Sequence, residues 1–222
     1  MQMIAAEIGQ NHMGDMNLAI ELIRLAKENG ADLAKFQLYD HNILYRGHPE
    51  IPDVALNYDN AKMLFEYGVS MGIEVFFSVF DVERIKWCED IGVKRYKIAK
   101  TLGNWSVIRC ILSTGKPVIS SQTVYAPASD IKQLFCVSEY PAKPCDYLLD
   151  FNSYDGVSDH TVGLDLSRIA LSQGAEIIEK HFAIDYQTGI DAPWSMTPDD
   201  LKELKRFEGV VNECRWDNNS QG

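Results

Sequence analysis

The chain has 222 residues, of which 46% are hydrophobic and 24% are charged, and its formal net charge is −11. This composition is typical of a soluble globular protein with room for one α/β barrel, although two small domains would also fit the length. The strong negative charge argues against binding to nucleic acid or to an anionic membrane.

The sequence also lacks the features of an exported or membrane-spanning protein. No apolar run reaches the length of about 18 residues that a membrane span needs. The amino-terminal stretch MQMIAAEIGQNH has neither the basic nor the long apolar region of a signal peptide. The five cysteines are odd in number and show no CxxC spacing, which argues against a disulfide framework or a structural zinc site. We therefore expect a cytoplasmic protein with reduced cysteines.

The first predicted elements are a strand over residues 3–9 and a helix that starts after Asp15, its expected N-cap. A pattern then recurs in which a helical stretch ends in glycine and a mostly apolar run follows, as expected for strands buried on both faces. Two further strands are predicted over residues 134–140 and 154–160, and the last helix begins at Pro198 behind the N-cap Thr197. The recurring stretches are NGADLAKFQ, MGIEVFFSVF, IGVKRYKIAK, TGKPVISSQ and QGAEIIEKHF.

These elements form roughly eight strand–helix units, which predicts a single-domain (βα)8 TIM barrel over residues 1–216 and a frayed tail over residues 217–222. The sixth unit is the weakest, because PAKPCDYLLDFNS leaves room for only a short helix. A doubly wound open sheet is the alternative, but no GxGxxG motif follows the first strand.

Polar side chains cluster where the predicted strands end, and barrel enzymes place their chemistry at this end of the strands. His160 and His181, at neighbouring strand ends, suit a divalent metal. Lys35 and Lys97 suit an anion with many oxygen atoms. Strand side chains alternate between faces, so residues i and i+2 point the same way and Lys180 would point outward. The pairs expected to share the barrel mouth are Lys35 with Gln37, Ser158 with His160, and Glu179 with His181.

Several of these residues also have a purely structural interpretation. A single histidine at a strand end is more often a hydrogen-bonded structural group than a metal ligand. Ser121 and Ser158 can simply cap the helices that follow them. Asp159 should face away from His160, and is expected to be structural. Lys35 differs, because an ammonium buried deep in the mouth is costly without a partner anion.

Seven stretches carry a resemblance to a known family: AEIGQNHMGD, GADLAKFQ, YKIA, GKPVISS, VSDHTVGLDLS, IIEKHFAID and GIDAPWSMTPDDLKEL. The chain resembles the sialic acid synthases, bacterial enzymes that condense phosphoenolpyruvate (PEP) with N-acetylmannosamine. The stretches keep that family's order and span nearly the whole chain. The resemblance implies a (βα)8 barrel, a homodimer, and a divalent metal of the Mn²⁺ type, with Mg²⁺ or Co²⁺ as alternatives. The implied products are a 2-keto nine-carbon sugar acid and phosphate.

The resemblance also implies roles for individual residues. His160 and His181 would hold the metal ion. Glu7, Glu179 and Asp191 would be the catalytic acids. Substrate binding would involve Lys35, Gln37, Lys97, Ser121, Ser138 and Ser158, with Ser138 where the family usually has asparagine.

The sequence departs from the family's pattern at several positions. Val79 stands where the family has a PEP-contacting threonine, Lys100 where it typically has serine, and Gln122 lies in an altered stretch, ISSQT. The antifreeze-like domain that helps the family to bind the sugar is not expected after the eighth helix. Two alternatives to a sialic acid-type synthase follow: a related synthase with another sugar acceptor, and a non-catalytic barrel that binds a metal or a sugar acid.

Overall fold

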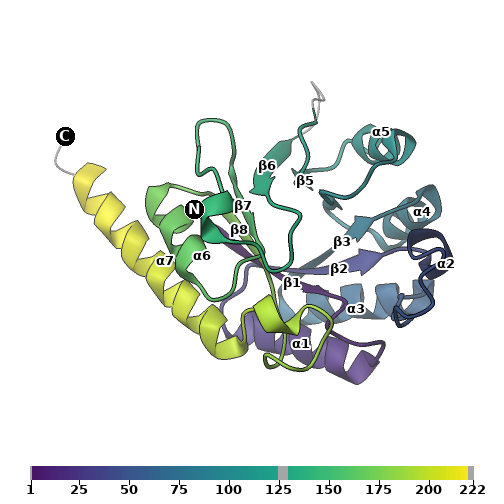
Figure 1. Cartoon of the computed structure of the whole chain (residues 1–222). Coiled ribbons are helices and arrows are strands. Elements are labelled where there is room, and N and C mark those ends of the chain that lie inside the picture. The colour runs from purple at the N-terminus through teal and green to yellow at the C-terminus, as the bar shows by residue number, and fades with distance from the viewer. Residues whose placement is uncertain (1, 125–129, 220–222) are drawn as a thin grey trace.

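The computed structural model describes residues 2–124 and 130–219, with side chains as far as residue 214, and its strands close into one barrel (Figure 1). Each strand pairs in parallel with the next one along the chain, and β8 returns to β1. The predicted (βα)8 architecture is confirmed. The strands are β1 (Met3–Gly9), β2 (Leu33–Leu38), β3 (Glu74–Val79), β4 (Tyr96–Ile98), β5 (Val118–Ser120), β6 (Ile131–Cys136), β7 (Gly156–Asp159) and β8 (Ile177–His181).

Helices pack around the outside of the barrel, with the long α7 lying along α6 on one side and α4 and α5 on the opposite side (Figure 1). The first helix follows the predicted pattern, because the Asp15 carboxylate accepts hydrogen bonds from the backbone N–H groups of Asn17 and Leu18. The helices are α1 (Met16–Glu28), α2 (His41–Leu44), α3 (Tyr58–Met71), α4 (Val82–Ile91), α5 (Trp105–Ser113), α6 (Asp165–Gln173) and α7 (Pro198–Asn219), with 3₁₀ turns η1 (Pro144–Asp146) and η2 (Ala192–Trp194).

The alternation of strand side chains divides the core into two parts. A large apolar cluster fills the space between the outer faces of the strands and the helices. A small second cluster takes residues from six of the strands and forms an apolar layer inside the barrel: Ala5, Leu33, Phe76, Ile119, Leu134 and Ile177. Two positions further along the same strands, the inward side chains change character: Glu7, Lys35, Ser78, Ser121, Cys136 and Glu179. Inside the barrel, a polar layer of side chains therefore lies directly above the apolar layer, toward the carboxyl ends of the strands.

The part of the barrel around β5 and β6 contains the weakest predicted unit, the sixth, and it agrees with the prediction only in part. Strand β6 starts at Ile131 and ends at Cys136, whereas the sequence predicted a strand over residues 134–140. The β5–β6 connection carries no helix in the residues that the structure describes there, 121–124 and 130. The sixth connection carries η1, in agreement with its short length. In the described part of the chain, no α-helix therefore follows β5 or β6 before the next strand.

The carboxyl-terminal helix is longer than the predicted domain boundary allows. Helix α7 continues to Asn219, so the first three residues of the expected tail are helical, and residues 220–222 lie outside the described part of the chain. None of the described helices combines the length and the apolar character that crossing a membrane requires. All five cysteines are free.

Candidate active site

A cavity of about 370 Å³ opens at the carboxyl ends of the strands, where a barrel presents its reactive side chains. Its volume falls in the range of about 300–1,000 Å³ that is usual for small-molecule sites. Ten of the eleven predicted site residues line it: Glu7, Lys35, Gln37, Lys97, Ser121, Ser158, His160, Glu179, His181 and Asp191. Three of them lie in matching register on β1, β2 and β8, since Glu7 pairs with both Lys35 and His181.

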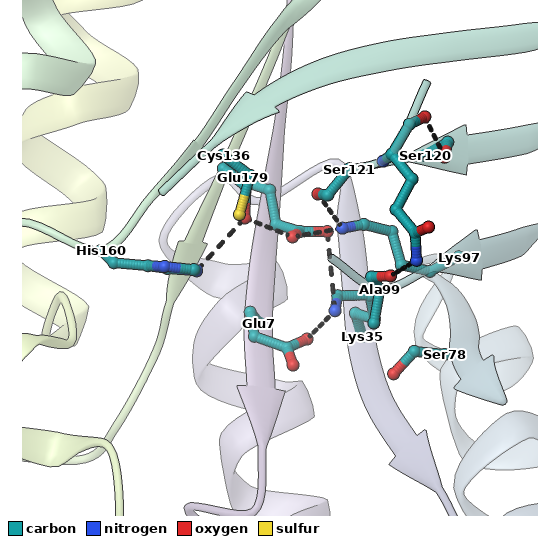
Figure 2. Close-up of polar contacts among 12 residues, drawn as sticks. Glu7, Lys35, Ser78, Lys97, Ala99, Ser120, Ser121, Cys136, His160 and Glu179 are labelled. Carbon is teal, nitrogen blue, oxygen red and sulfur yellow. Dashed lines mark hydrogen bonds and ion pairs between the residues drawn. The ribbon is translucent and has the colours of Figure 1, made fainter. Parts of the chain in front are cut away.

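Two lysines and two glutamates form a buried ion-pair network on the cavity floor (Figure 2). Lys35 Nζ lies 2.8 Å from Glu7 Oε2 and 3.6 Å from Glu179 Oε2. Lys97 Nζ donates to Glu179 Oε1 at 2.9 Å. Each of the four residues is at most 4% exposed, and burying charged groups at this depth is costly unless they are paired, as they are here.

Glu179 is the centre of this network. Burial by itself would raise the pKa of its carboxyl group, but the ammonium groups of Lys35 and Lys97 and the hydrogen bonds from Lys97 and Ser158 outweigh it and lower the pKa. Ser158 Oγ donates to Glu179 Oε1 at 2.8 Å, and Lys97 Nζ also donates to Ser121 Oγ at 2.7 Å. The predicted hydroxyls therefore face the charged network instead of capping helices.

Gln37 holds the other carboxylate in place. Its side-chain nitrogen donates to Glu7 Oε1 at 2.9 Å, while its oxygen accepts from Gln10 Nε2 at 3.3 Å. Gln10 also donates to the hydroxyl of Tyr45 at 2.7 Å, which links the network to the loop after β2. Lys35 and Gln37 share the barrel mouth, as their i,i+2 spacing predicted.

The two histidines lie side by side at the mouth, with ring centroids 5.5 Å apart. His160 Nδ1 lies 2.7 Å from the carbonyl oxygen of Val137, and a carbonyl only accepts, so Nδ1 carries the proton. Burial, followed by the neighbouring His181, lowers the pKa of His160 to about 3. His160 is therefore neutral near pH 7, with the lone pair of Nε2 unprotonated and available to a ligand or metal.

His181 completes the pair and contacts an acid from a distant loop. Its Nδ1 lies 3.3 Å from Asp191 Oδ2, but this buried nitrogen has no well-aligned hydrogen-bond partner in the described structure. A carboxylate beside one imidazole nitrogen is the usual arrangement around metal-binding histidines. The described residues contain no group of three or more His, Cys, Asp or Glu side chains arranged for a metal, so a divalent ion here would rely on these two imidazoles and on substrate or water.

The neighbours of these residues on the opposite strand faces are structural, as the alternation predicted. Lys180 Nζ lies 3.3 Å from Asp159 Oδ2 and donates to the carbonyl oxygen of Thr161 at 2.6 Å. Asp159 also accepts hydrogen bonds from Thr161 and Ser167. This buried pair joins the outer faces of β7 and β8 to α6, and it fixes the direction of the strand ends that carry His160 and His181.

Ser138 is the predicted site residue that the structure does not bring to the cavity. Leu134 and Cys136 face inward, and continued alternation would have made Ser138 the next inward residue. Because β6 ends at Cys136, the alternation stops there and Ser138 is exposed. The thiol of Cys136 takes the inward position instead, and burial raises its pKa.

Of the three departures from the family pattern, only one reaches the cavity. Val79 is buried in the outer core, because it points away from the barrel interior. Gln122 donates to the carbonyl oxygens of Ala99 and Leu102 and so holds the loop after β4 in place. Lys100 is exposed and lines the cavity.

Tyr140, the last residue of the strand predicted over residues 134–140, lines the cavity but is not among the predicted site residues. Its ring stacks on His160 at a centroid distance of 4.2 Å and meets His181 edge-on at 5.9 Å. The ring of Trp194 also packs against Tyr140, at a centroid distance of 5.7 Å. The signal was present in the sequence as the EYP stretch after β6, but nothing in its spacing indicates that the chain turns back over the histidines.

Comparisons with known proteins agree with this geometry. A family model described as the NeuB family matches residues 22–213. The N,N'-diacetyllegionaminic acid synthase of Legionella pneumophila is 32% identical, over 90% of this chain and 69% of its own. The human N-acetylneuraminate-9-phosphate synthase is 28% identical, over 95% of this chain and 70% of its own.

A solved structure shows the same arrangement in three dimensions. The N-acetylneuraminic acid (sialic acid) synthetase of Leptospira borgpetersenii, in complex with citrate, superposes with a TM-score of 0.88 at 29% identity, covering 96% of this chain and 84% of that one. The resemblance inferred from the motifs is therefore confirmed over nearly the whole barrel. The chain belongs to the NeuB family, together with synthases of sialic, legionaminic and pseudaminic acids.

Proposed function

We propose that this protein condenses PEP with the aldehyde of an N-acetylated hexosamine of the N-acetylmannosamine type, giving a sialic acid-like 2-keto nine-carbon acid and phosphate. The observation that carries the proposal is the convergence of Lys35, Lys97, Glu7, Glu179 and the two histidines on one cavity. The family membership of the chain supports the same reaction class.

The lysine half of the cavity suits the phosphate and carboxylate groups of PEP. Lys35 and Lys97 each carry three N–H donors, and in the described structure both point toward internal carboxylates. An incoming anion would compete with Glu7 and Glu179 for these donors. Ser121 and Ser158 add hydroxyl donors at the same level of the barrel. This arrangement would hold C3 of PEP in one orientation, which is the positioning contribution to catalysis.

The histidine half of the cavity suits the aldehyde. In the proposed reaction, the C2=C3 electron pair of PEP forms the new bond to the aldehyde carbon, and the aldehyde oxygen takes up a proton. Water then adds to C2 and gives up one proton. The bond between C2 and the bridging oxygen of the phosphate breaks, and the hydroxyl on C2 passes its proton to the departing phosphate, which leaves the 2-keto group. The buried Oε2 of Glu179 accepts no hydrogen bond from a described residue, so this carboxylate oxygen is the one that would take the proton from the water.

His160 and His181 would hold a divalent ion of the Mn²⁺ type, which polarises the aldehyde oxygen when it is bound. The fit rests on the neutral state of His160, on the nearby His181 ring, and on the Asp191 carboxylate beside His181 Nδ1. Asp191 also lines the cavity and would meet a hydroxyl or the acetamido group of the sugar.

The test is a phosphate-release assay with purified protein, Mn²⁺, PEP and N-acetylmannosamine. We expect release that requires both substrates and disappears when the metal is chelated. Phosphate released from PEP without any sugar would indicate hydrolysis, and no release with any N-acetylated hexosamine would refute the proposal. In that case calorimetry would show which alternative holds. Binding of PEP or Mn²⁺ would indicate a non-catalytic binding barrel, and binding of neither would indicate that the cavity is not a site for them.

A second acceptor is favoured by a specific observation. Two of the relatives are N,N'-diacetyllegionaminic acid synthases, at 32% and 29% identity. Lys100 is the one departure from the family pattern that lines the cavity. The alternative acceptor is therefore a hexose with two acetamido groups. A screen in which only N-acetylmannosamine is turned over would exclude the diacetamido hexose as acceptor. A kcat/KM at least tenfold higher with the diacetamido hexose would make that sugar the preferred acceptor instead of N-acetylmannosamine.

A further inference from the structure

Asn11 has a place in this site that its position in the sequence does not reveal. It lies in the turn after β1 and is completely buried. Its side-chain nitrogen donates to the carbonyl oxygen of Phe182 and to Ser195 Oγ, both at 3.0 Å. Its oxygen accepts from the backbone N–H of Asp191 at 2.8 Å. One amide thus connects the first strand to the segment after the last strand.

The Asn11 amide binds one backbone group of Asp191 directly and the other through Ser195. Asn11 receives the N–H of Asp191, and Ser195 Oγ, which accepts from Asn11, donates to the carbonyl oxygen of Asp191 at 2.8 Å. Both polar groups of the Asp191 backbone are therefore bound to the same pair of side chains. The Asp191 carboxylate is left to reach His181 Nδ1, 3.3 Å away.

Outside Asn11, this segment is held mainly at its two ends, by the bridge between Phe182 and Met196 and by the hydrogen bond from the Tyr186 hydroxyl to Asp200 at 2.6 Å. Residues 184–187 are exposed, and their side chains lie outside the core. Gly189 packs directly on Asn11, since a Cβ at this glycine would lie 2.4 Å from Asn11 Oδ1, and its φ of +130° also disfavours other residues. The close approach and the hydrogen bonds mark Asn11 as the anchor point of the segment.

We propose that Asn11 is a positioning residue that acts through Asp191: it fixes the backbone from which Asp191 orients His181 toward the cavity. The inference rests on the proposed function, because it assigns to His181 a role in holding a divalent ion. Carboxylates beside metal-binding imidazoles typically change metal affinity by about 10–100-fold. Loss of the Asn11 side chain is expected to weaken Mn²⁺ binding at His160 and His181 by a factor of that order. PEP binding at Lys35 and Lys97 is expected to stay unchanged.

The test uses Mn²⁺ alone and PEP alone as probes, with binding measured by calorimetry on the full chain. Asn11→Ala should weaken Mn²⁺ binding at least tenfold and leave PEP binding within twofold. Ser195→Ala removes the contact to the Asp191 carbonyl but keeps the hydrogen bond from the Asp191 N–H to Asn11, so it should shift Mn²⁺ binding in the same direction by less. Equal weakening of both probes would indicate a merely structural role and would overturn the inference, as would unchanged Mn²⁺ binding in Asn11→Ala.

A double-mutant cycle tests the route through Asp191. If Asn11 acts only through this residue, adding Asn11→Ala to Asp191→Ala should change Mn²⁺ affinity by less than twofold. An undiminished effect in that background would overturn the inference. Gly189→Ala, which pushes the segment off Asn11, should reproduce the Asn11→Ala result and keeps the test valid if Asn11→Ala does not fold. Wild-type protein that binds no Mn²⁺ would instead refute the metal part of the proposed function.

Discussion

At the scale of single residues, the cavity floor contains its own counterions. The two ammonium groups of Lys35 and Lys97 are matched by two carboxylates, Glu7 and Glu179, so the network has no net charge. Removing one partner from such a buried set leaves an uncompensated charge, which is strongly destabilising. In the proposed function, the same lysines would exchange their internal partners for the oxygen atoms of the substrate when it binds. Stability and binding therefore depend on the same contacts.

Replacing Lys35 should separate the two substrates. Lys35→Met keeps most of the side-chain volume but removes the ammonium, and a hydrogen bond to a charged group contributes about 1.5–3 kcal/mol. We expect PEP binding to weaken by about 10–150-fold, while the KM of the sugar changes by less than about twofold. Calorimetry with PEP and steady-state kinetics check this. Lys132→Met is the matched control, because Lys132 also contacts two carboxylates but lies outside the cavity. Equal losses for both substrates would contradict the assignment of Lys35.

His181→Ala should abolish Mn²⁺ binding and metal-dependent turnover but leave a folded barrel. The imidazole contributes at the mouth of the cavity and not to the apolar layer beneath it. Metal binding by calorimetry and folding by circular dichroism check this prediction. Tyr140→Leu provides a useful comparison, since it removes the ring stacked on His160 without removing an imidazole. A variant lacking His181 that still binds Mn²⁺ with unchanged affinity would contradict the role given to this residue.

At the scale of elements, the sequence predicts best where a residue's place depends on strand alternation alone. Lys35 with Gln37, Ser158 with His160, and Glu179 with His181 all share the cavity because each pair lies on or directly after one continuous strand. The prediction fails at Ser138 for the same reason: alternation holds only within a strand, and β6 ends two residues earlier. Strand ends depend on tertiary packing, which local sequence does not encode.

Residues that reach the site from loops were harder to predict. Tyr140 stacks on His160 only because the chain turns back after β6, and Asn11 acts through contacts more than 170 residues away along the chain. No periodicity or spacing connects Asn11 with Phe182 or Ser195. Asp191 was named from the resemblance to the family and not from the residues around it. Long-range contacts of this kind appear only in the folded structure.

The start of β7 offers a test of barrel packing. Gly156 pairs with Ile177 of β8, and a Cβ at this glycine would lie 1.9 Å from the carbonyl oxygen of Ile177. Gly156→Ala should therefore force the two strands apart and lower the free energy of unfolding by roughly 1–3 kcal/mol, the usual cost of overpacking. Urea unfolding measures the change.

A glycine in a helix provides the matched control. Gly209 lies in α7, and a Cβ added there would meet no atom within 4 Å. Gly209→Ala should raise the free energy of unfolding by about 0.5–1 kcal/mol, because alanine is the better helix former. If both alanine variants changed stability in the same direction and by similar amounts, the close strand approach at Gly156 would not be the cause of the loss.

At the scale of the whole molecule, the charge distribution reconciles an acidic protein with an anionic substrate. The net charge is −11, yet two lysines are gathered on the floor of the cavity and Lys100 lies at its mouth. The acidic residues are mostly paired at the surface or cap helices, as Asp15 and Asp81 do. The positions of these lysines, and not the net charge of the chain, therefore determine whether the cavity attracts an anion. The homodimer stays a prediction, which light scattering of the purified chain can test.

The dependence of stability on pH is a property of the whole chain, but it can be traced to buried histidines. Burial lowers the pKa of His12 to about 4 and that of His160 to about 3. In the unfolded chain a histidine takes up a proton below about pH 6.5, whereas the folded protein keeps both rings neutral down to the lowered values. The unfolded state therefore binds more protons, and stability must fall as the pH decreases from about 6.5 toward 4.

Replacing His12 isolates one of these contributions. Asparagine keeps an acceptor for the N–H of Gly14, which His12 Nδ1 now receives at 3.1 Å, but it does not titrate. We expect His12→Asn to reduce the slope of unfolding free energy against pH by about 1.4 kcal/mol per pH unit between roughly pH 4.5 and 6. Urea unfolding in the presence of a chelator measures the slope. An unaltered slope in His12→Asn would show that this buried ring does not resist protonation, because a ring that titrates alike in the folded and unfolded states contributes nothing to the dependence on pH.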